Sequence, residues 1–131
     1  NGCFDLLHPG HVKLLSASRQ QGDVLIVAID DDPSVRRVKG EGRPIISSRE
    51  RVGIVSAFDS VDHVVVFASD DLHRLIEIIR PDVLTKGSNY TTDEVIGRRL
   101  VEKLGGRVVR IPVTDPVSST RIIEAIKGNT G

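Results

Sequence analysis

Two histidines near the start of the chain have the type and spacing to act on one ligand. His8 and His11 stand three residues apart in the sequence NGCFDLLHPGH, with Pro9 and Gly10 between them. Pro9 suits the first position of a helix, because that position has no hydrogen-bonded N–H to lose and already has the φ angle of proline. We therefore predict a helix from Pro9, with both imidazoles on one side of its first turn.

A helix that begins in this way is a favourable place for an anion. Its first turn has free backbone N–H groups and lies at the positive end of the helix dipole, so it attracts phosphate. A capped helix with two surface histidines would also explain either histidine taken alone. We interpret the set as a phosphate site because of all its members together, which are Gly2, Phe4, Asp5, His8, Gly10 and His11.

A second signal for phosphate lies near the C-terminus. Ser118, Ser119 and Thr120 stand where another helix is expected to begin, and Arg121 follows them. An N-cap needs only one hydroxyl, and an arginine in a first turn is unfavourable unless an anion is near. Two helix starts at one cleft would suit a triphosphate, with one holding the reacting phosphorus and the other the departing pyrophosphate.

Positive charge is concentrated in one segment of a chain that has no net charge. Positions 36 to 51 contain two acidic residues and six basic ones. The basic residues are Arg36, Arg37, Lys39, Arg43, Arg49 and Arg51. Gly40, Gly42 and Pro44 in the same segment indicate a flexible loop that can close over a polyanionic substrate, although a solvated face is the alternative. The zero net charge argues against nucleic acid or a membrane as partner.

Length and composition indicate one folded domain over residues 1–131, since the chain is 39% hydrophobic. It has no apolar run near the roughly 18 residues that cross a bilayer and no charged-then-apolar leader. Cys3 is the single cysteine, so an internal disulfide and a cysteine-based zinc site are excluded. We expect a cytoplasmic protein in which Cys3 is a small residue at a strand end rather than a nucleophile.

Apolar runs and helical patterns alternate along the chain. Strands are expected at 24–29, 61–67, 82–85 and 107–111, and helices from Pro9, from Pro33, after Ser47 or Ser48, over 72–79, from Asp93 and after Ser118. Alternation favours parallel pairing, so we predict a three-layer α/β sandwich with a Rossmann-like parallel five-stranded sheet. The first strand would precede residues 1–5 and is mostly missing from this chain.

Polar residues follow several of these strands. Asp30, Asp31 and Asp32 come directly after the strand at 24–29; we expect them to form a turn and a helix cap, with a metal or ribose contact as the alternative. The motif before His8, residues 86–90 and residues 117–121 fall at the same edge of the sheet. Ligands of such folds bind at the carboxyl ends of the strands, so the sequence predicts one site.

Family resemblance is visible at this point. GCFDLLHPGH resembles the HxGH signature of the nucleotidyltransferase superfamily, and VSSTR is similar to its C-terminal phosphate loop. The resemblance covers essentially the whole chain. KGEGRP and RPDVLTKGSNY are most similar to the adenylyltransferases that make ADP-heptose from heptose 1-phosphate, enzymes that in some bacteria are fused to a sugar kinase. The resemblance implies ATP and a phosphorylated sugar as partners, with Mg²⁺ carried by ATP. A homodimer is expected from the general prevalence of such assemblies.

The resemblance and the residue chemistry together define an expected site. His8 and His11 would donate hydrogen bonds to the α-phosphate, Lys39 and Arg43 would clamp phosphates, and the three C-terminal hydroxyls would hold the β and γ groups. Asn89 departs from the family, which commonly has aspartate there. The residues are, for catalysis, His8, His11 and Lys39; around the nucleotide, Cys3, Phe4, Gly10, Lys13, Arg43, Lys86, Gly87, Ser118, Ser119 and Thr120; and in acceptor or secondary positions, Asp5, Arg51, Asp62 and Asn89.

Two other functions stay open, and a third is disfavoured. A cytidylyltransferase acting on glycerol 3-phosphate or a similar alcohol phosphate would use the same motifs. A nucleotide-binding module without turnover would keep the helix starts but would not need both histidines. A dinucleotide-dependent oxidoreductase is disfavoured, because the expected GxGxxG is missing and Gly40 and Gly42 lie in the basic loop instead.

Overall fold

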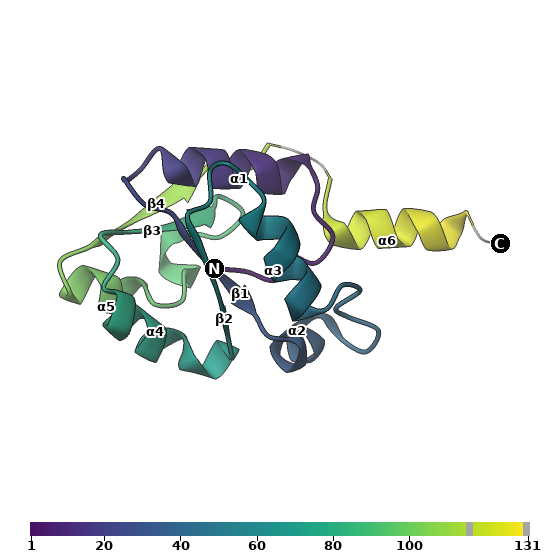
Figure 1. Cartoon of the computed structure of the whole chain (residues 1–131), viewed down its shortest axis with the longest axis horizontal. Helices are drawn as coiled ribbons and strands as arrows, with labels where there is room; N and C mark the ends of the chain where they lie inside the picture. The colour runs from purple at the N-terminus through teal and green to yellow at the C-terminus, as the bar shows by residue number, and fades with distance from the viewer. Residues whose placement is uncertain (115–116, 130–131) are drawn as a thin grey trace.

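Helices and parallel strands alternate along the computed structural model, which describes residues 1–114 and 117–129 (Figure 1). The elements in chain order are α1 (Pro9–Arg19), β1 (Ile26–Asp30), α2 (Asp32–Lys39), α3 (Ser48–Ser56), β2 (His63–Phe67), the 3₁₀ turn η1 (Ser69–Asp71), α4 (Leu72–Ile79), β3 (Val83–Gly87), the 3₁₀ turn η2 (Thr92–Glu94), α5 (Arg98–Lys103), β4 (Arg107–Ile111) and α6 (Ser119–Gly128). The predicted α/β alternation is confirmed.

The strands of the described residues form two parallel pairs rather than one sheet. β1 pairs with β2, with Ile26 opposite His63, and β3 pairs with β4, with Val83 opposite Arg107. Gly2 lies beside β1: its N–H donates to the carbonyl of Ala28 and its own carbonyl accepts from the N–H of Asp30, each at 3.0 Å. The segment expected at the end of the first strand therefore contributes one bridge, too little for a strand of its own.

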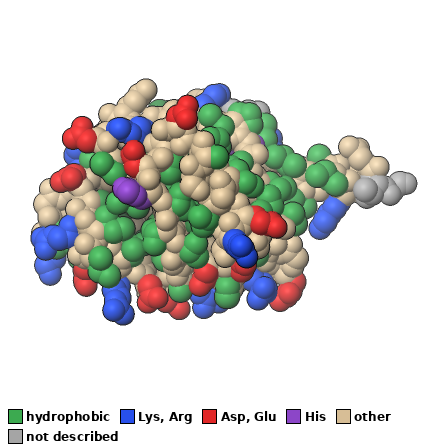
Figure 2. Space-filling model, viewed as in Figure 1, with side chains coloured by type: hydrophobic (Ala, Val, Ile, Leu, Met, Phe, Trp, Pro, Cys, Tyr) green, Lys and Arg blue, Asp and Glu red, His purple; other side chains and the backbone are tan. Residues whose placement is uncertain are grey.

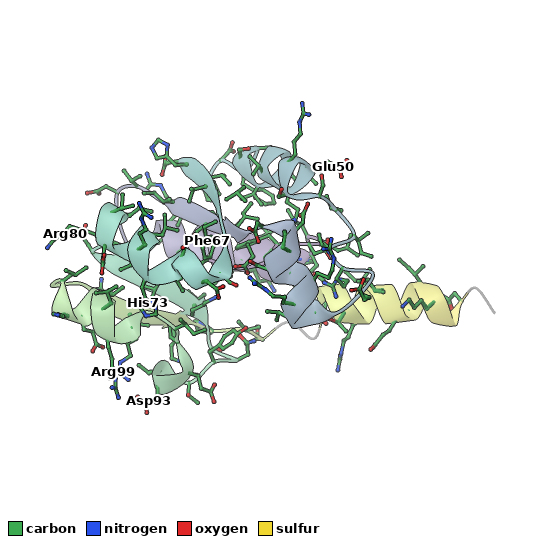
Figure 3. The ribbon with its side chains drawn as sticks, turned by 90° about the horizontal axis from the view of Figure 1, so that it is seen from below. Glu50, Phe67, His73, Arg80, Asp93 and Arg99 are labelled. Atoms are coloured by element: carbon green, nitrogen blue, oxygen red, sulfur yellow. The ribbon has the colours of Figure 1, made fainter. Side chains whose placement is uncertain are left out.

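Helices pack against both faces of the β1–β2 pair. Successive residues of a strand point to opposite faces, so Val27 and Ile29 face one way and Ala28 the other. The first core cluster contains Phe4, Leu15, Val27, Ile29 and Val55, from the N-terminal loop, α1, β1 and α3. The second contains Ala28, Phe67, Leu72, Ile76 and Val101, which brings in α4 and α5. In Figure 3, His73 of α4 and Arg99 of α5 accordingly lie apart from Glu50 of α3.

One predicted helix begins later than its capping signal suggested. Asp93 lies in η2, where Thr91 and Glu94 form a capping box, and the helix itself starts at Arg98. Gly97 interrupts the chain between them with a φ of +91°, and a Cβ at this position would lie 2.5 Å from Cδ1 of Ile76. Ile96, an apolar residue just before Gly97, is 66% exposed rather than packed inward. Close packing of the backbone against α4 therefore sets the start of α5.

The C-terminal helix α6 leaves the body of the molecule. Figure 1 shows it pointing away from the other elements, and Figure 2 shows hydrophobic atoms where it departs, on a surface whose acidic and basic side chains are interspersed. No described residue of α6 is buried, and Ile126 is 57% exposed. Among the described residues, no helix combines the length and apolar character needed to span a membrane.

Candidate nucleotide site

The two histidines of the first motif cap the helix that they begin. His8 is the extended N-cap of α1, and its Nδ1 accepts the N–H of Gly10 at 3.1 Å. The Nδ1 of His11 in turn accepts the N–H of His8 at 3.3 Å, which completes a capping box built from imidazoles. The ring centroids are 4.0 Å apart. The predicted helix start, with both rings on one side, is confirmed.

This capping fixes where each imidazole carries its proton. An Nδ1 that accepts a backbone N–H cannot be protonated, so in the neutral ring the proton sits on Nε2. Burial and the neighbouring His8 lower the pKa of His11 to about 4, so His11 is neutral at pH 7. The ring of Phe4, which is buried, lies 5.4 Å from that of His11 and supports it. His11 is thus a neutral donor through Nε2.

The start of α6 lies against the first motif. Ser119 donates its hydroxyl to the carbonyl of Leu6 at 2.6 Å, across 113 positions of sequence. Ser118 is the N-cap of α6, since its hydroxyl accepts the N–H of Arg121 at 3.1 Å, and Thr120 lies in the first turn. The structure therefore brings together the two helix starts that the sequence singled out.

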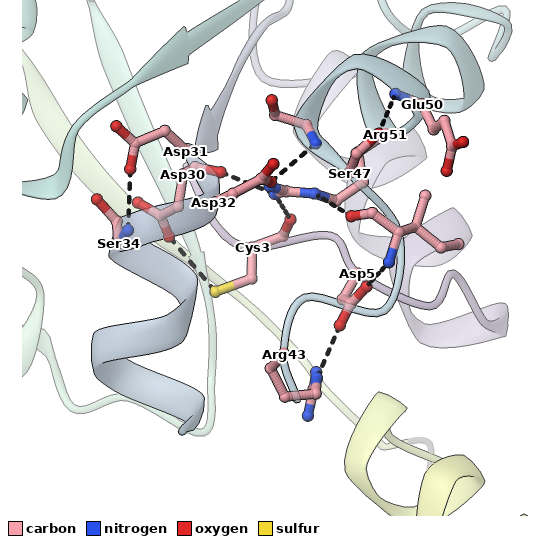
Figure 4. Close-up of polar contacts among 12 residues, drawn as sticks. Cys3, Asp5, Asp30, Asp31, Asp32, Ser34, Arg43, Ser47, Glu50 and Arg51 are labelled. Atoms are coloured by element: carbon pink, nitrogen blue, oxygen red, sulfur yellow. Dashed lines mark hydrogen bonds and ion pairs between the residues drawn. The ribbon is translucent and has the colours of Figure 1, made fainter. Parts of the chain in front are cut away.

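Asp5 joins the first motif to the basic loop, which in the structure comprises residues 40–47 between α2 and α3. Its carboxylate, 1% exposed, accepts Nε of Arg43 at 2.7 Å and the N–H groups of Ile45 and Ile46 at 2.9 Å (Figure 4). Burial opposes ionisation, but these three donors outweigh it and hold the pKa of Asp5 below its ordinary value. Arg43 is therefore fastened beside the motif, with its Nε engaged, while Lys39 at the end of α2 is exposed.

Cys3 and Lys86 lie at the carboxyl ends of the strands. The Cys3 thiol donates to Oδ2 of Asp30 at 3.5 Å; burial and then Asp30 raise its pKa, opposed by the charges of Lys39 and Arg51. Cys3 is thus a thiol at neutral pH, as a structural role requires. Lys86 donates Nζ to the carbonyl of Asn1 at 2.7 Å, and burial lowers its pKa.

Gly87 and Asn89 follow β3 at the same edge. Gly87 is buried, and a Cβ there would lie 2.7 Å from Oδ1 of Asn89 and 2.8 Å from Cγ2 of Val113. A side chain at Gly87 would therefore displace the side chains of Asn89 and Val113. Gly10 gives its N–H to His8, and Lys13 is exposed one turn further along α1.

Two residues carried over from the resemblance do not lie in the open site. Asp62 precedes β2, at the amino end of the strand, where it accepts the N–H of Leu25 at 2.8 Å and pairs with Arg19 at 3.2 Å. Arg51 is fully buried and so cannot be reached from solvent. Its position four residues before the buried Val55 on one helix face was the signal for burial, which the charge of the segment masked.

The aspartates after β1 form a turn and a cap. Asp31 is the N-cap of α2, accepting the N–H of Ser34 at 2.9 Å, and Asp32 pairs with Arg51 at 2.7 Å. Within residues 1–114 and 117–129, no group of three or more His, Cys, Asp or Glu side chains could hold a metal ion. The carbonyl of Leu6 and the amides of Ile45 and Ile46 also organise the site, and no side-chain signal could have identified these backbone groups.

Comparison with known proteins identifies the family. The model of the cytidylyltransferase-like family matches residues 1–125. The chain belongs to this family. It is 60% identical over its whole length to the bifunctional protein HldE of Desulfatibacillum aliphaticivorans and 52% identical over 126 residues, 96% of the chain, to that of Geobacter sulfurreducens. It spans only 27% and 26% of those two proteins, respectively.

A solved structure has the same arrangement of elements. The crystal structure of the lipopolysaccharide core biosynthesis protein from Thermoplasma volcanium GSS1 superposes with a TM-score of 0.72 at 28% sequence identity. The match covers 88% of this chain and 93% of that one. Membership of the family thus agrees with both the motifs and the parallel α/β fold.

Proposed function

We propose that this chain is a nucleotidyltransferase that moves the adenylyl group of ATP to a sugar 1-phosphate, specifically heptose 1-phosphate, giving an ADP-sugar and pyrophosphate. The observation that carries the proposal is the contact between Ser119 and Leu6, which sets the start of α6 beside the paired histidines of α1. The high identity to proteins named bifunctional protein HldE and the likeness to a lipopolysaccharide core biosynthesis protein support heptose as the sugar.

The reaction is an in-line displacement at phosphorus. An oxygen of the acceptor phosphate forms a bond to the α-phosphorus of ATP, the bond from that phosphorus to the bridging oxygen breaks, and pyrophosphate leaves with its electron pair. Because the attacking oxygen is already negative, no general base or covalent intermediate is required. Catalysis then consists of positioning and of stabilising the charge that develops on the α-phosphate.

The side chains take roles that follow from their positions. His8 and His11 donate from Nε2 to the α-phosphate oxygens, and phosphates are held by Lys39 at the end of α2 and by Arg43 in the basic loop. The hydroxyls and free N–H groups of Ser118, Ser119 and Thr120 hold the β and γ groups. The residues that shape the pocket for the nucleotide are Cys3, Phe4, Gly10, Lys13, Lys86, Gly87 and Asn89.

A magnesium ion is compatible with this donor set. Since no described cluster of carboxylates forms a cage, the ion would be held chiefly by the triphosphate and water, as Mg²⁺ usually is. When bound, it neutralises phosphate charge. The protein's own part is to place the α-phosphate at the two imidazoles.

We also propose that the two strand pairs belong to one five-stranded sheet in a three-layer, Rossmann-like domain. A cavity of about 420 Å³ lies between them, lined by residues of β1 and β3 such as Ala28 and Thr85. Gly2, paired with β1, stands at the carboxyl end of the position that a central strand would take. Residues 1–131 would then form a single domain of a cytoplasmic protein that pairs as a homodimer. The word bifunctional in the name of its relatives supports a link to a second activity, which we propose is a sugar kinase.

The activity is tested by release of pyrophosphate. The protein is incubated with Mg²⁺ and either ATP or CTP, against heptose 1-phosphate, glucose 1-phosphate and glycerol 3-phosphate. We expect release with ATP and heptose 1-phosphate, at a kcat/KM at least about tenfold above any other pair, which corresponds to 1.4 kcal/mol. Preference for CTP with glycerol 3-phosphate would favour the alternative transferase, and no release with any pair would favour a binding module.

A further inference from the structure

Arg51 is a fully buried arginine whose guanidinium bonds to three separate segments of the chain. Its Nη1 donates to the carbonyls of Cys3 at 2.6 Å and Asp30 at 2.8 Å, and its Nε donates to the carbonyl of Ile46 at 3.0 Å. The Nη2 group donates to Oδ1 of Asp32 at 2.7 Å. Figure 4 shows these segments converging on the side chain. Burying such a charge is costly unless it is well hydrogen-bonded, and here each of the three guanidinium nitrogens has an acceptor.

Three of the four acceptors of Arg51 are backbone carbonyls of segments that form the site. Cys3 lies in the first motif, Asp30 ends β1, and Ile46 lies in the basic loop that carries Arg43. Because these three acceptors belong to the backbone, the guanidinium fixes the path of the chain at three points and not only the position of one side chain. Its planar fork supplies donors in several fixed directions, which the ammonium of lysine does not.

Ile46 is held from both sides. Its N–H donates to the Asp5 carboxylate at 2.9 Å, while its carbonyl accepts from Arg51 at 3.0 Å. Phe4, which lies between Cys3 and Asp5, has a φ of +51°. The chain turns there, so that the carbonyl of Cys3 bonds to Arg51 and the side chain of Asp5 bonds to the basic loop. Arg51 and Asp5 therefore fix the basic loop against the first motif as one unit.

We propose that Arg51 is a positioning residue of the transferase, holding the basic loop and the first motif in register so that Lys39 and Arg43 lie across from the paired histidines. The inference rests on the proposed function for its kinetic part and on hydrogen bonds alone for its structural part. Arg51 touches no substrate, because none of its surface is open to solvent.

The variant Arg51→Lys tests this, with Arg74→Lys on the exposed surface of α4 as matched control. We expect Arg51→Lys to remain folded and to lose about 10- to 100-fold in kcat, since displacing catalytic groups by about 1 Å costs up to that much, with KM for both substrates within about twofold. The control should have the kcat of the parent protein. A raised KM for one substrate at unchanged kcat would instead indicate direct contact, and an unchanged kcat with lower thermal stability would indicate scaffolding only; both overturn the proposal.

Amide hydrogen exchange separates this proposal from the proposed function. In Arg51→Lys, the N–H groups of Ile45 and Ile46 should exchange at least about tenfold faster than in the parent, while those of α4 keep their rates. Faster exchange at these two residues would support the structural role of Arg51 even if no transfer reaction is found. Unchanged exchange at both residues would overturn it.

A double variant measures whether Arg51 and Asp5 act as one unit. If they do, Arg51→Lys combined with Asp5→Asn should lower kcat by clearly less than the product of the two single effects. Strictly multiplicative losses would contradict a shared role. Should Arg51→Lys fail to fold, Asp32→Asn removes the charge that faces Nη2 and keeps an oxygen for the N–H of Ser48, which Oδ1 also accepts at 2.8 Å. A lower kcat at unchanged KM then supports the proposal, and parent kinetics overturn it.

Discussion

At the scale of single residues, the histidines of α1 have two tasks that reinforce each other. By accepting backbone N–H groups at Nδ1, His8 and His11 cap the helix and leave Nε2–H as the donor on each ring. The sequence could predict their shared direction from their spacing. It could not predict the tautomers, because these depend on which backbone groups the folded chain brings to each Nδ1.

Replacing His11 tests its part in transfer. We expect His11→Ala to lower kcat by about 10² to 10³, comparable with the loss of one oxyanion donor, while KM for ATP changes little. The lost cap should lower the free energy of unfolding by about 1 kcal/mol. Steady-state kinetics and urea unfolding measure the two effects, with His73→Ala on exposed α4 as control. A kcat within about twofold of the parent would rule out the proposed role.

The lowered pKa of His11 predicts how stability depends on pH. Its pKa is about 4 in the folded protein, against 6.5 for the ordinary side chain. Between these values the unfolded chain binds a proton that the folded protein does not, so the free energy of unfolding should fall as the pH is lowered from about 6.5 to about 4.

Urea unfolding at pH 7 and pH 5 measures this dependence. His11→Gln, which cannot titrate, should lose part of the difference between the two pH values, whereas His63→Gln on the exposed end of β2 should keep it. Asp5 acts in a different window, because its pKa lies below 3.8 and its contribution is lost only at lower pH. Equal differences in His11→Gln and the parent would contradict the pKa shift.

At the scale of elements, capping residues and apolar periodicity predicted most starts and ends. Ser47 caps α3 and Asp31 caps α2, both through local hydrogen bonds that sequence displays directly. α5 was misplaced because its start is set by Gly97 against Ile76, a contact between segments distant in sequence. The helical spacing of Arg51 and Val55 indicated a buried face, but the acceptors that make burial of the charge possible come from three segments and could not be predicted.

The basic loop offers a prediction at this scale. Lys39 ends α2 with an exposed side chain, so Lys39→Ala should leave thermal stability unchanged. If its amine clamps a phosphate, KM for ATP or the sugar phosphate should rise by about 5- to 30-fold, equivalent to about 1–2 kcal/mol of lost binding. Lys103→Ala, at the exposed end of α5, is the control. An unchanged KM for both substrates would assign Lys39 to solvation only.

At the scale of the whole molecule, the fold brings distant segments to one edge. The segment before α1 bonds to β1 through Gly2, to Lys86 of β3 through Asn1 and to the start of α6 through Leu6, in line with the expectation from alternating strands and helices. The sequence could not predict that α6 would point outward, because the apolar spacing that predicts a helix does not show which surface it contacts, and none of its described residues is buried.

The central claim is that both helix starts bind one triphosphate. It is tested most directly by following backbone amide signals in ¹⁵N spectra while ATP with Mg²⁺ is added. If the claim holds, the amides of Gly10 at the start of α1 and of Thr120 at the start of α6 shift together, with one midpoint. Movement of only one of the two signals, or two separate midpoints, would contradict it.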